Sequence, residues 1–167
     1  IEDAYLKIYP ISGYGNQELL RQLMNVEKPD AILHYTDPRF WTWLYQMEHE
    51  IRQHVPIFYY NIWDDRPTPR YNEFFYESCD LIMNISKQTV AMVKDAAVNK
   101  PRNKWDNTYI PHGIPEDKFH PINELDVEEW NQLQTFRKKV LHRKNKDFII
   151  FWNNRNIRRK VPSDVIM

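Results

Sequence analysis

The chain has 167 residues, of which 42% are hydrophobic, and its 23 basic and 23 acidic side chains give a formal net charge of zero. This composition excludes a disordered chain and a globally basic nucleic-acid binder, and the length suits one domain better than two. Cys79 is the only cysteine, which excludes an intrachain disulfide framework and a cysteine-based metal cluster and favours a reducing compartment.

Strand-like and helix-like segments alternate along most of the sequence. Residues 5–9 (YLKIY) alternate in polarity and predict a first strand, and the leucines of residues 19–26 recur at helical spacing. The continuous apolar run at residues 31–35 predicts a strand covered on both faces. Further strands are predicted at residues 57–63, 81–85 and 109–110. This alternation predicts an α/β fold, a Rossmann-like parallel sheet with flanking helices.

Two sequence signals mark helix starts. Asp37, with Pro38 at the first helical position, predicts one start, and Ser86 predicts another. His49 and His54 are five residues apart and do not share a helix face, so no metal site is predicted there. The expected buried face of the first of these helices consists of Phe40, Leu44, Met47 and Ile51.

Two adjacent acids, Asp64 and Asp65, follow the most apolar predicted strand. Ligands gather outside the carboxyl ends of the strands in an open parallel sheet, so Asp64 is a candidate site residue. In the alternative interpretation, one acid caps a helix at residues 71–78 and the other pairs with Arg66 or Arg70. An adjacent pair of aspartates does not predict a divalent ion.

The sequence changes character after Pro121. Asp126 and Glu129 form a capping pair for a helix, and residues 137–160 contain ten Lys or Arg and a single acid, so they face an anion or water. The apolar run at residues 148–152 predicts a strand that opens a new domain. The apolar side of the predicted helix consists of Trp130, Leu133, Phe136 and Val140.

Two motifs flank the boundary between the predicted domains: IPHGIPEDKFHP at residues 110–121, and the pair Arg155 and Lys160, which stand five residues apart in the loop after the second predicted domain begins. Together they resemble the interdomain segment of family 4 glycosyltransferases. The family has the GT-B fold, in which two Rossmann-like domains face each other across a cleft. The first domain of the family closes with I-P-N/H-G-V/I followed by F-x-P, matched here by Ile110, Pro111, His112, Gly113, Ile114, Phe119 and Pro121.

The resemblance implies a domain organisation. Residues 1–122 would form an incomplete N-terminal acceptor-side domain, residues 123–146 a charged connecting helix, and residues 147–167 the start of a donor-side domain. The chain would then be a fragment of a cytoplasmic retaining glycosyltransferase, inactive alone, with no integral membrane segment. The predicted strand at residues 148–152, if uncovered, would pair with another copy of the chain.

The resemblance also implies roles for individual residues. Arg155 and Lys160 would bind the diphosphate of a nucleotide-sugar donor, which is a substrate, so that no cofactor and no metal are expected. Asp64 would be catalytic. The residues expected to contact the acceptor or the transferred sugar are Trp63, His112 and Gly113. The acceptor would be a saccharide, a lipid or a protein.

Trp63 stands where the family commonly places a histidine. A tryptophan there would stack on a sugar ring or belong to the core. This departure keeps open an alternative, a GT-B relative that is not a transferase, such as a nucleotide-sugar epimerase or an inactive binding domain. A nucleic-acid-binding module is a further alternative, disfavoured by the zero net charge and the lack of a nucleic-acid motif, so no nucleic-acid partner is expected.

Overall fold

The computed structural model describes residues 6–99, 106–139 and 152–154, and these ranges are considered below. The chain divides into two compact units, Ile1–Gly113 and Ile114–Met167. The predicted strand at residues 148–152 lies outside the described residues except for Trp152, which is half-buried and in no helix or strand. Arg155 and Lys160 also lie outside them.

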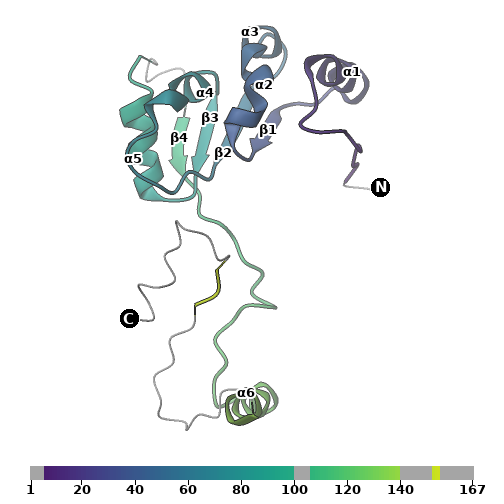
Figure 1. Cartoon of the computed structure of the whole chain (residues 1–167). Helices are drawn as coiled ribbons and strands as arrows, with labels where there is room; N and C mark the ends of the chain where they lie inside the picture. The colour runs from purple at the N-terminus through teal and green to yellow at the C-terminus, as the bar shows by residue number, and fades with distance from the viewer. Residues whose placement is uncertain (1–5, 100–105, 140–151, 155–167) are drawn as a thin grey trace. The chain divides into compact units, whose positions relative to one another are not determined.

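The first unit is built on a four-stranded parallel sheet with the strand order β1-β2-β3-β4 (Figure 1). Each strand pairs in parallel with the next strand along the chain, which confirms the predicted Rossmann-like α/β fold. The predicted pairing of the apolar runs near residues 31–35 and 57–62 is therefore also confirmed. The strands are β1 (Ile32–Tyr35), β2 (Ile57–Asn61), β3 (Leu81–Asn84) and β4 (Asp106–Tyr109).

A strand was predicted at residues 5–9, but residues 6–9, which the structure describes, form no strand of the sheet. That prediction is therefore wrong for these residues. Lys7 forms an isolated bridge, and neither it nor its described neighbours joins the sheet. The side chains of Lys7 and Tyr9 instead bond the carboxylate of Glu27. The alternating pattern therefore reflects attachment to a neighbouring helix by exposed polar contacts.

Among the described residues of the first unit there are seven short helices, of which one precedes β1 and six connect the strands. The predicted starts at Asp37 and Ser86 are confirmed, since Asp37 accepts a hydrogen bond from the Arg39 amide and Ser86 accepts one from the Thr89 amide. The helices are α1 (Gln17–Glu27), η1 (Pro38–Trp41), α2 (Thr42–Gln46), α3 (Glu48–Ile51), η2 (Arg70–Asn72), α4 (Glu73–Glu77) and α5 (Lys87–Ala96).

The helix predicted after Asp37 is divided into η1, α2 and α3. Leu44, Met47 and Ile51 are buried as expected. Phe40 is 53% exposed, so its predicted burial is wrong. The reason is the 3-10 geometry of the first turn, which changes the angular spacing of side chains from that of an α-helix. Phe40 stacks on Tyr14 instead, at 4.9 Å between ring centroids.

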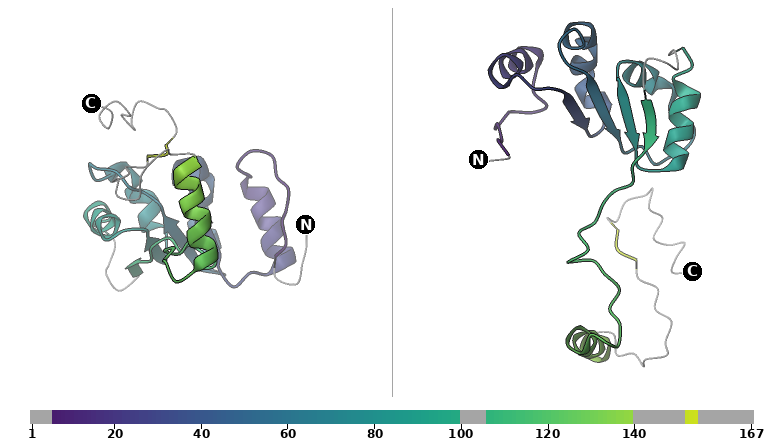
Figure 2. Two further views of the ribbon diagram at one scale, coloured as in Figure 1. Left: turned by 90° about the horizontal axis from the view of Figure 1, so that it is seen from below. Right: turned by 180° about the vertical axis from the view of Figure 1, so that it is seen from behind.

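The connecting helices pack against one face of the sheet. Ile57, Tyr59 and Ile82 point into a core shared with helical residues of α2 to α5. Viewed from behind, the four strands stand in front of these helices (Figure 2). Residues of opposite parity line the other face, where Leu33 is 60% exposed and Tyr35 is 58% exposed. The prediction that residues 31–35 are covered on both faces is therefore wrong, because no described helix of the first unit covers the second face.

An ion-pair network ties the amino ends of the strands together. The Asp80 carboxylate accepts hydrogen bonds from the Arg52 guanidinium and, at 2.9 Å, from the backbone amide of Ile57. Arg52 also pairs with Glu48 at 2.8 Å. The side chains of Glu48, Arg52 and Asp80 therefore link α3 to the amino ends of β2 and β3.

The second unit contains one described helix, α6 (Val127–Lys139). Asp126 accepts a hydrogen bond from the Glu129 amide at 3.2 Å, which confirms the predicted helix start. The Glu129 carboxylate also bonds His120 at 2.7 Å and thereby raises the pKa of that imidazole. Phe119 is 62% exposed, and the turn before it is closed by hydrogen bonds from the Lys118 and Phe119 amides to the Pro115 carbonyl.

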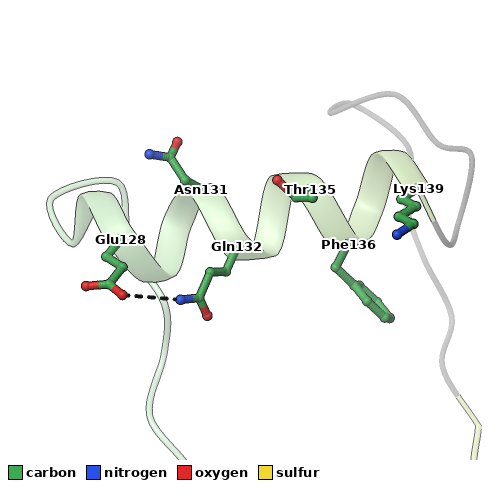
Figure 3. A pocket seen from close by; sticks show the side chains of 6 residues that line it. All are labelled: Glu128, Asn131, Gln132, Thr135, Phe136 and Lys139. Carbon is green, nitrogen blue, oxygen red and sulfur yellow. Dashed lines mark hydrogen bonds between the residues drawn. The ribbon is translucent and has the colours of Figure 1, made fainter.

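The expected apolar side of α6 is only partly covered. Trp130 and Leu133 are half-buried, Phe136 is 51% exposed, and Val140 lies outside the described residues. A shallow hollow on the same helix has walls from this one element, so it encloses no ligand-sized space (Figure 3). The hollow is lined by Glu128, Asn131, Gln132, Thr135, Phe136 and Lys139. Among the described helices, none combines the length and the hydropathy that a membrane crossing requires.

Candidate functional site

Two groups of aromatic and charged side chains lie near the carboxyl ends of β1 and β2 in the first unit. The first group, the tryptophan cluster, consists of Asp37, Arg39, Trp63 and Tyr71. The second group, the tyrosine–histidine row, consists of Tyr35, Tyr60 and His112. The carboxyl edge of a parallel sheet is where ligands bind in open α/β folds.

Trp63 is the centre of the tryptophan cluster. The Arg39 guanidinium carbon lies 5.5 Å from the centroid of its ring, a cation–π contact. Tyr71 meets the same indole edge-on, at 5.9 Å between centroids. Trp63 is half-buried and belongs neither to a strand nor to the main apolar core. The core interpretation of this tryptophan is therefore wrong.

Asp37 orients Arg39 in this cluster. The Arg39 guanidinium donates to both oxygens of the Asp37 carboxylate, from Nε at 2.9 Å to Oδ1 and from Nη2 at 2.5 Å to Oδ2. These bonds are the main reason why the pKa of Asp37 lies below its usual value. Asp37 also caps η1, so one carboxylate fixes both the helix start and the cation over the indole.

Hydrogen bonds hold the backbone of Trp63 from two sides. Its amide donates to Asn61 Oδ1 at 3.1 Å, and its carbonyl accepts from Thr89 Oγ1 at 2.7 Å. The indole Nε1 donates to the Asp65 carbonyl at 2.8 Å. The indole position is thus fixed by bonds to β2, to α5 and to its own loop.

A row of three asparagines, two of them buried, supports this loop. Asn61 donates to Asn84 Oδ1 at 3.1 Å, and Asn84 donates to Asn107 Oδ1 at 2.6 Å and to the Thr108 carbonyl at 3.0 Å. Asn107 donates in turn to the Val90 carbonyl at 3.1 Å. Asn61 and Asn84 are fully buried. This asparagine row was not predicted from the sequence, although β2 and β3 both end in Asn and β4 carries one near its start.

Asp64 is exposed and makes no hydrogen bond or ion pair with any residue that the structure describes. Asp65 Oδ1 accepts from the Arg66 amide at 2.8 Å. The alternative in which these acids cap the next helix is wrong, because neither η2 nor α4 has a side-chain cap. Arg70 pairs with Asp95 instead, at 3.2 Å.

The tyrosine–histidine row lies on the open face of the sheet. Tyr35 and Tyr60 are neighbours in the register of β1 and β2, and their ring centroids are 5.4 Å apart. The His112 ring lies 5.5 Å from that of Tyr60. The Tyr60 hydroxyl is 3.0 Å from the Ile110 carbonyl and 3.3 Å from His112 Nδ1.

Gly113 follows His112 and is exposed. A Cβ atom at this position would meet nothing within 4 Å, and its φ is outside the left-handed region. The described geometry therefore does not require glycine there.

His34 lies beneath this edge and is 4% exposed. Its ring stacks on Tyr59 at 5.1 Å, and its Nδ1 is 2.5 Å from the Tyr45 hydroxyl. Burial lowers the pKa of His34 to about 4, so the imidazole is neutral at physiological pH. Its Nε2 has no partner among the described residues.

No protein-family model, curated protein or solved structure matches this chain. Within residues 6–99, 106–139 and 152–154, no group of three or more His, Cys, Asp or Glu side chains is placed to hold a metal ion. The features of this chain that bear on its function are therefore the geometry of the carboxyl edge and the sequence motifs.

Proposed function

We propose that this chain is part of a retaining glycosyltransferase of the GT-B fold. In this proposal residues 1–122 belong to the acceptor-side domain, and residues 147–167 open the donor-side domain. The parallel sheet of the first unit is compatible with such a domain. Two groups of aromatic side chains at its carboxyl edge further support the proposal, because aromatic faces pack against the C–H groups of pyranose rings.

One observation carries the proposal. At the end of β2, a tryptophan ring fixed by hydrogen bonds to its backbone and indole nitrogen is followed by an exposed carboxylate with no described partner. The ring of Trp63 supplies an apolar surface, and the Asp64 carboxylate supplies acceptors for hydroxyl groups. Sugars present both kinds of group on one small ring.

The donor would bind through the basic loop near the carboxyl end of the chain. Arg155 offers a bidentate guanidinium and Lys160 a compact positive charge, and both complement a diphosphate. The positive charges would stabilise the leaving nucleoside diphosphate as the bond to the sugar breaks. Asp64 and His112 would contact hydroxyl groups of the sugars, and no bound metal is required.

The experiment is a turnover assay on the full-length gene product with a panel of nucleotide sugars. We expect hydrolysis or transfer of at least one donor, with the anomeric configuration of that donor retained in the product. Replacing Arg155 with alanine should lower kcat by about tenfold or more, because a charge-assisted contact to the leaving group is lost. Lys138→Ala, which removes an exposed cation of α6, is the matched control and should leave kcat unchanged.

Absence of turnover with every donor would contradict the proposal, as would equal kcat values for Arg155→Ala and the unmodified protein. The position of Trp63, where the family commonly has histidine, favours one alternative, a nucleotide-sugar epimerase. Product analysis in the same assay separates the two functions. An epimerase yields an isomeric nucleotide sugar, whereas a transferase releases the nucleoside diphosphate.

A further inference from the structure

The tyrosine–histidine row is separate from the residues that the proposed donor chemistry uses, except for His112. Tyr35 is 58% exposed on the edge strand β1, Tyr60 is half-buried, and His112 is exposed. Successive rings are 5.4 and 5.5 Å apart, and each pair is tilted by 36°. Three aromatic rings thus form a continuous accessible surface at the carboxyl edge of the open face.

Hydrogen bonding around Tyr60 assigns the tautomer of His112. The Tyr60 hydroxyl has one hydrogen, and the nearer acceptor is the Ile110 carbonyl at 3.0 Å, which has no donor hydrogen of its own. The contact at 3.3 Å between the Tyr60 oxygen and His112 Nδ1 is then donated by Nδ1–H. In the neutral ring, Nε2 consequently carries the lone pair and accepts hydrogen bonds.

We propose that Tyr35, Tyr60 and His112 bind a pyranose ring, so that the acceptor of the transferase is a saccharide. The aromatic faces pack on the C–H face of the sugar, and His112 Nε2 accepts a hydrogen bond from one of its hydroxyl groups. The assignment of this sugar as the acceptor rests on the proposed glycosyltransferase function. The binding of a sugar to the row is independent of that proposed function.

The chemistry of the row favours a sugar over an apolar partner. The open face has two parts: its amino-terminal part carries Leu33 and Phe58 without polar atoms, whereas the row adds a hydroxyl and an imidazole to its rings. A second copy of the chain or another apolar partner would cover the aliphatic part of this face. A ligand of the row needs both an apolar face and hydroxyl donors, and a pyranose has both.

The test is saturation-transfer NMR on the 167-residue chain with methyl β-D-glucopyranoside and methyl β-D-galactopyranoside as probes. Glycerol, which has hydroxyl groups but no ring face, is the ligand control. We expect saturation transfer to at least one glycoside, with a Kd in the range of about 1–10 mM and the strongest signals from ring C–H protons. Tyr35→Ala and His112→Ala should each weaken binding by about threefold or more.

Two further variants make the test specific. Tyr60→Phe keeps the aromatic face but removes the oxygen that orients His112, so it should weaken binding less than Tyr35→Ala does. Tyr14→Ala removes an exposed aromatic residue of another stacked pair and should leave binding unchanged. Circular dichroism of each variant confirms that the fold is retained.

Three results would overturn the proposal. They are absence of saturation transfer to both glycosides, equal binding by Tyr35→Ala and the unmodified chain, and a concentration-dependent dimer that Tyr35→Ala dissociates. If the saccharide site exists but the proposed glycosyltransferase function is wrong, the experiments give a different set of results. Glycoside binding sensitive to Tyr35→Ala, together with no turnover of nucleotide sugars by the full-length protein, would leave the saccharide site in place and remove the transferase.

Discussion

Replacing Asn84 with alanine is expected to lower the free energy of unfolding by about 3 kcal/mol. Asn84 is fully buried and joins the side chains of Asn61 and Asn107. Its removal leaves the amide donor of Asn61 and the carbonyl oxygens of the Asn107 side chain and the Thr108 backbone without this partner. Each buried polar group left unpaired costs roughly 1–3 kcal/mol. Partial relaxation of the neighbouring strands keeps the sum near the lower end of the range.

Urea unfolding followed by circular dichroism measures this loss. Asn99→Ala is the matched control, because Asn99 is exposed and its side chain makes one bond, to Glu73. Its effect should stay within about 0.5 kcal/mol. Equal unfolding midpoints for the two variants would show that the asparagine row does not stabilise the carboxyl edge.

Lowering the pH from about 7 to about 4.5 is expected to reduce the free energy of unfolding by about 2 kcal/mol through His34 alone. Burial lowers the pKa of the folded imidazole to about 4, whereas the unfolded chain keeps a value near 6.5. Between about pH 6.5 and pH 4, the His34 imidazole is protonated in the unfolded chain but mostly neutral in the folded chain. Stability is therefore lost as the pH falls from about 6.5 towards 4, and this loss levels off below the folded pKa.

The measurement compares urea midpoints at both pH values for the unmodified chain and for His34→Gln. The variant should be less stable at neutral pH, because the bond between His34 and Tyr45 is altered, but its pH dependence in this window should be nearly flat. The carboxylate of Asp37, whose pKa is lowered by Arg39, loses its contribution only in more acidic solution. A pH dependence of equal size in both proteins would contradict the assignment to His34.

The sequence predicts β1, β2 and β3 well because their signal is local, whereas the segment predicted as a strand at residues 5–9 does not join the sheet and the last strand, predicted at residues 109–110, is observed at Asp106–Tyr109. The residues of β2 and β3 form short apolar runs bounded by turn or capping residues, and their order along the chain predicts a parallel sheet. The open face was not predicted, because an apolar run does not reveal whether another element covers both of its sides. Leu33 and Tyr35 have the residue types of a buried strand, yet they are exposed.

The sequence pointed to Trp63 and Asp64 near the end of a strand, but it did not indicate which other side chains lie around them. Asp64 was singled out because it follows a predicted strand and Trp63 because of the family resemblance, and both lie just past the end of β2. Arg39 and Tyr60 were missed, since their contacts depend on the register between β1 and β2 and on the return of the chain after β4. Contacts between residues so distant in sequence are set by tertiary packing.

The most direct test of the account is a map of backbone amide shifts of the 167-residue chain during titration with UDP-glucose at millimolar concentration. The proposal predicts shifted amides in residues 35–39, 60–66 and 109–113, which include the proposed sugar contacts, and in residues 155–160, which carry the proposed diphosphate contacts. Shifts confined to the opposite ends of the strands, in residues 30–32, 56–57 and 80–81, or confined to α6, would contradict the account.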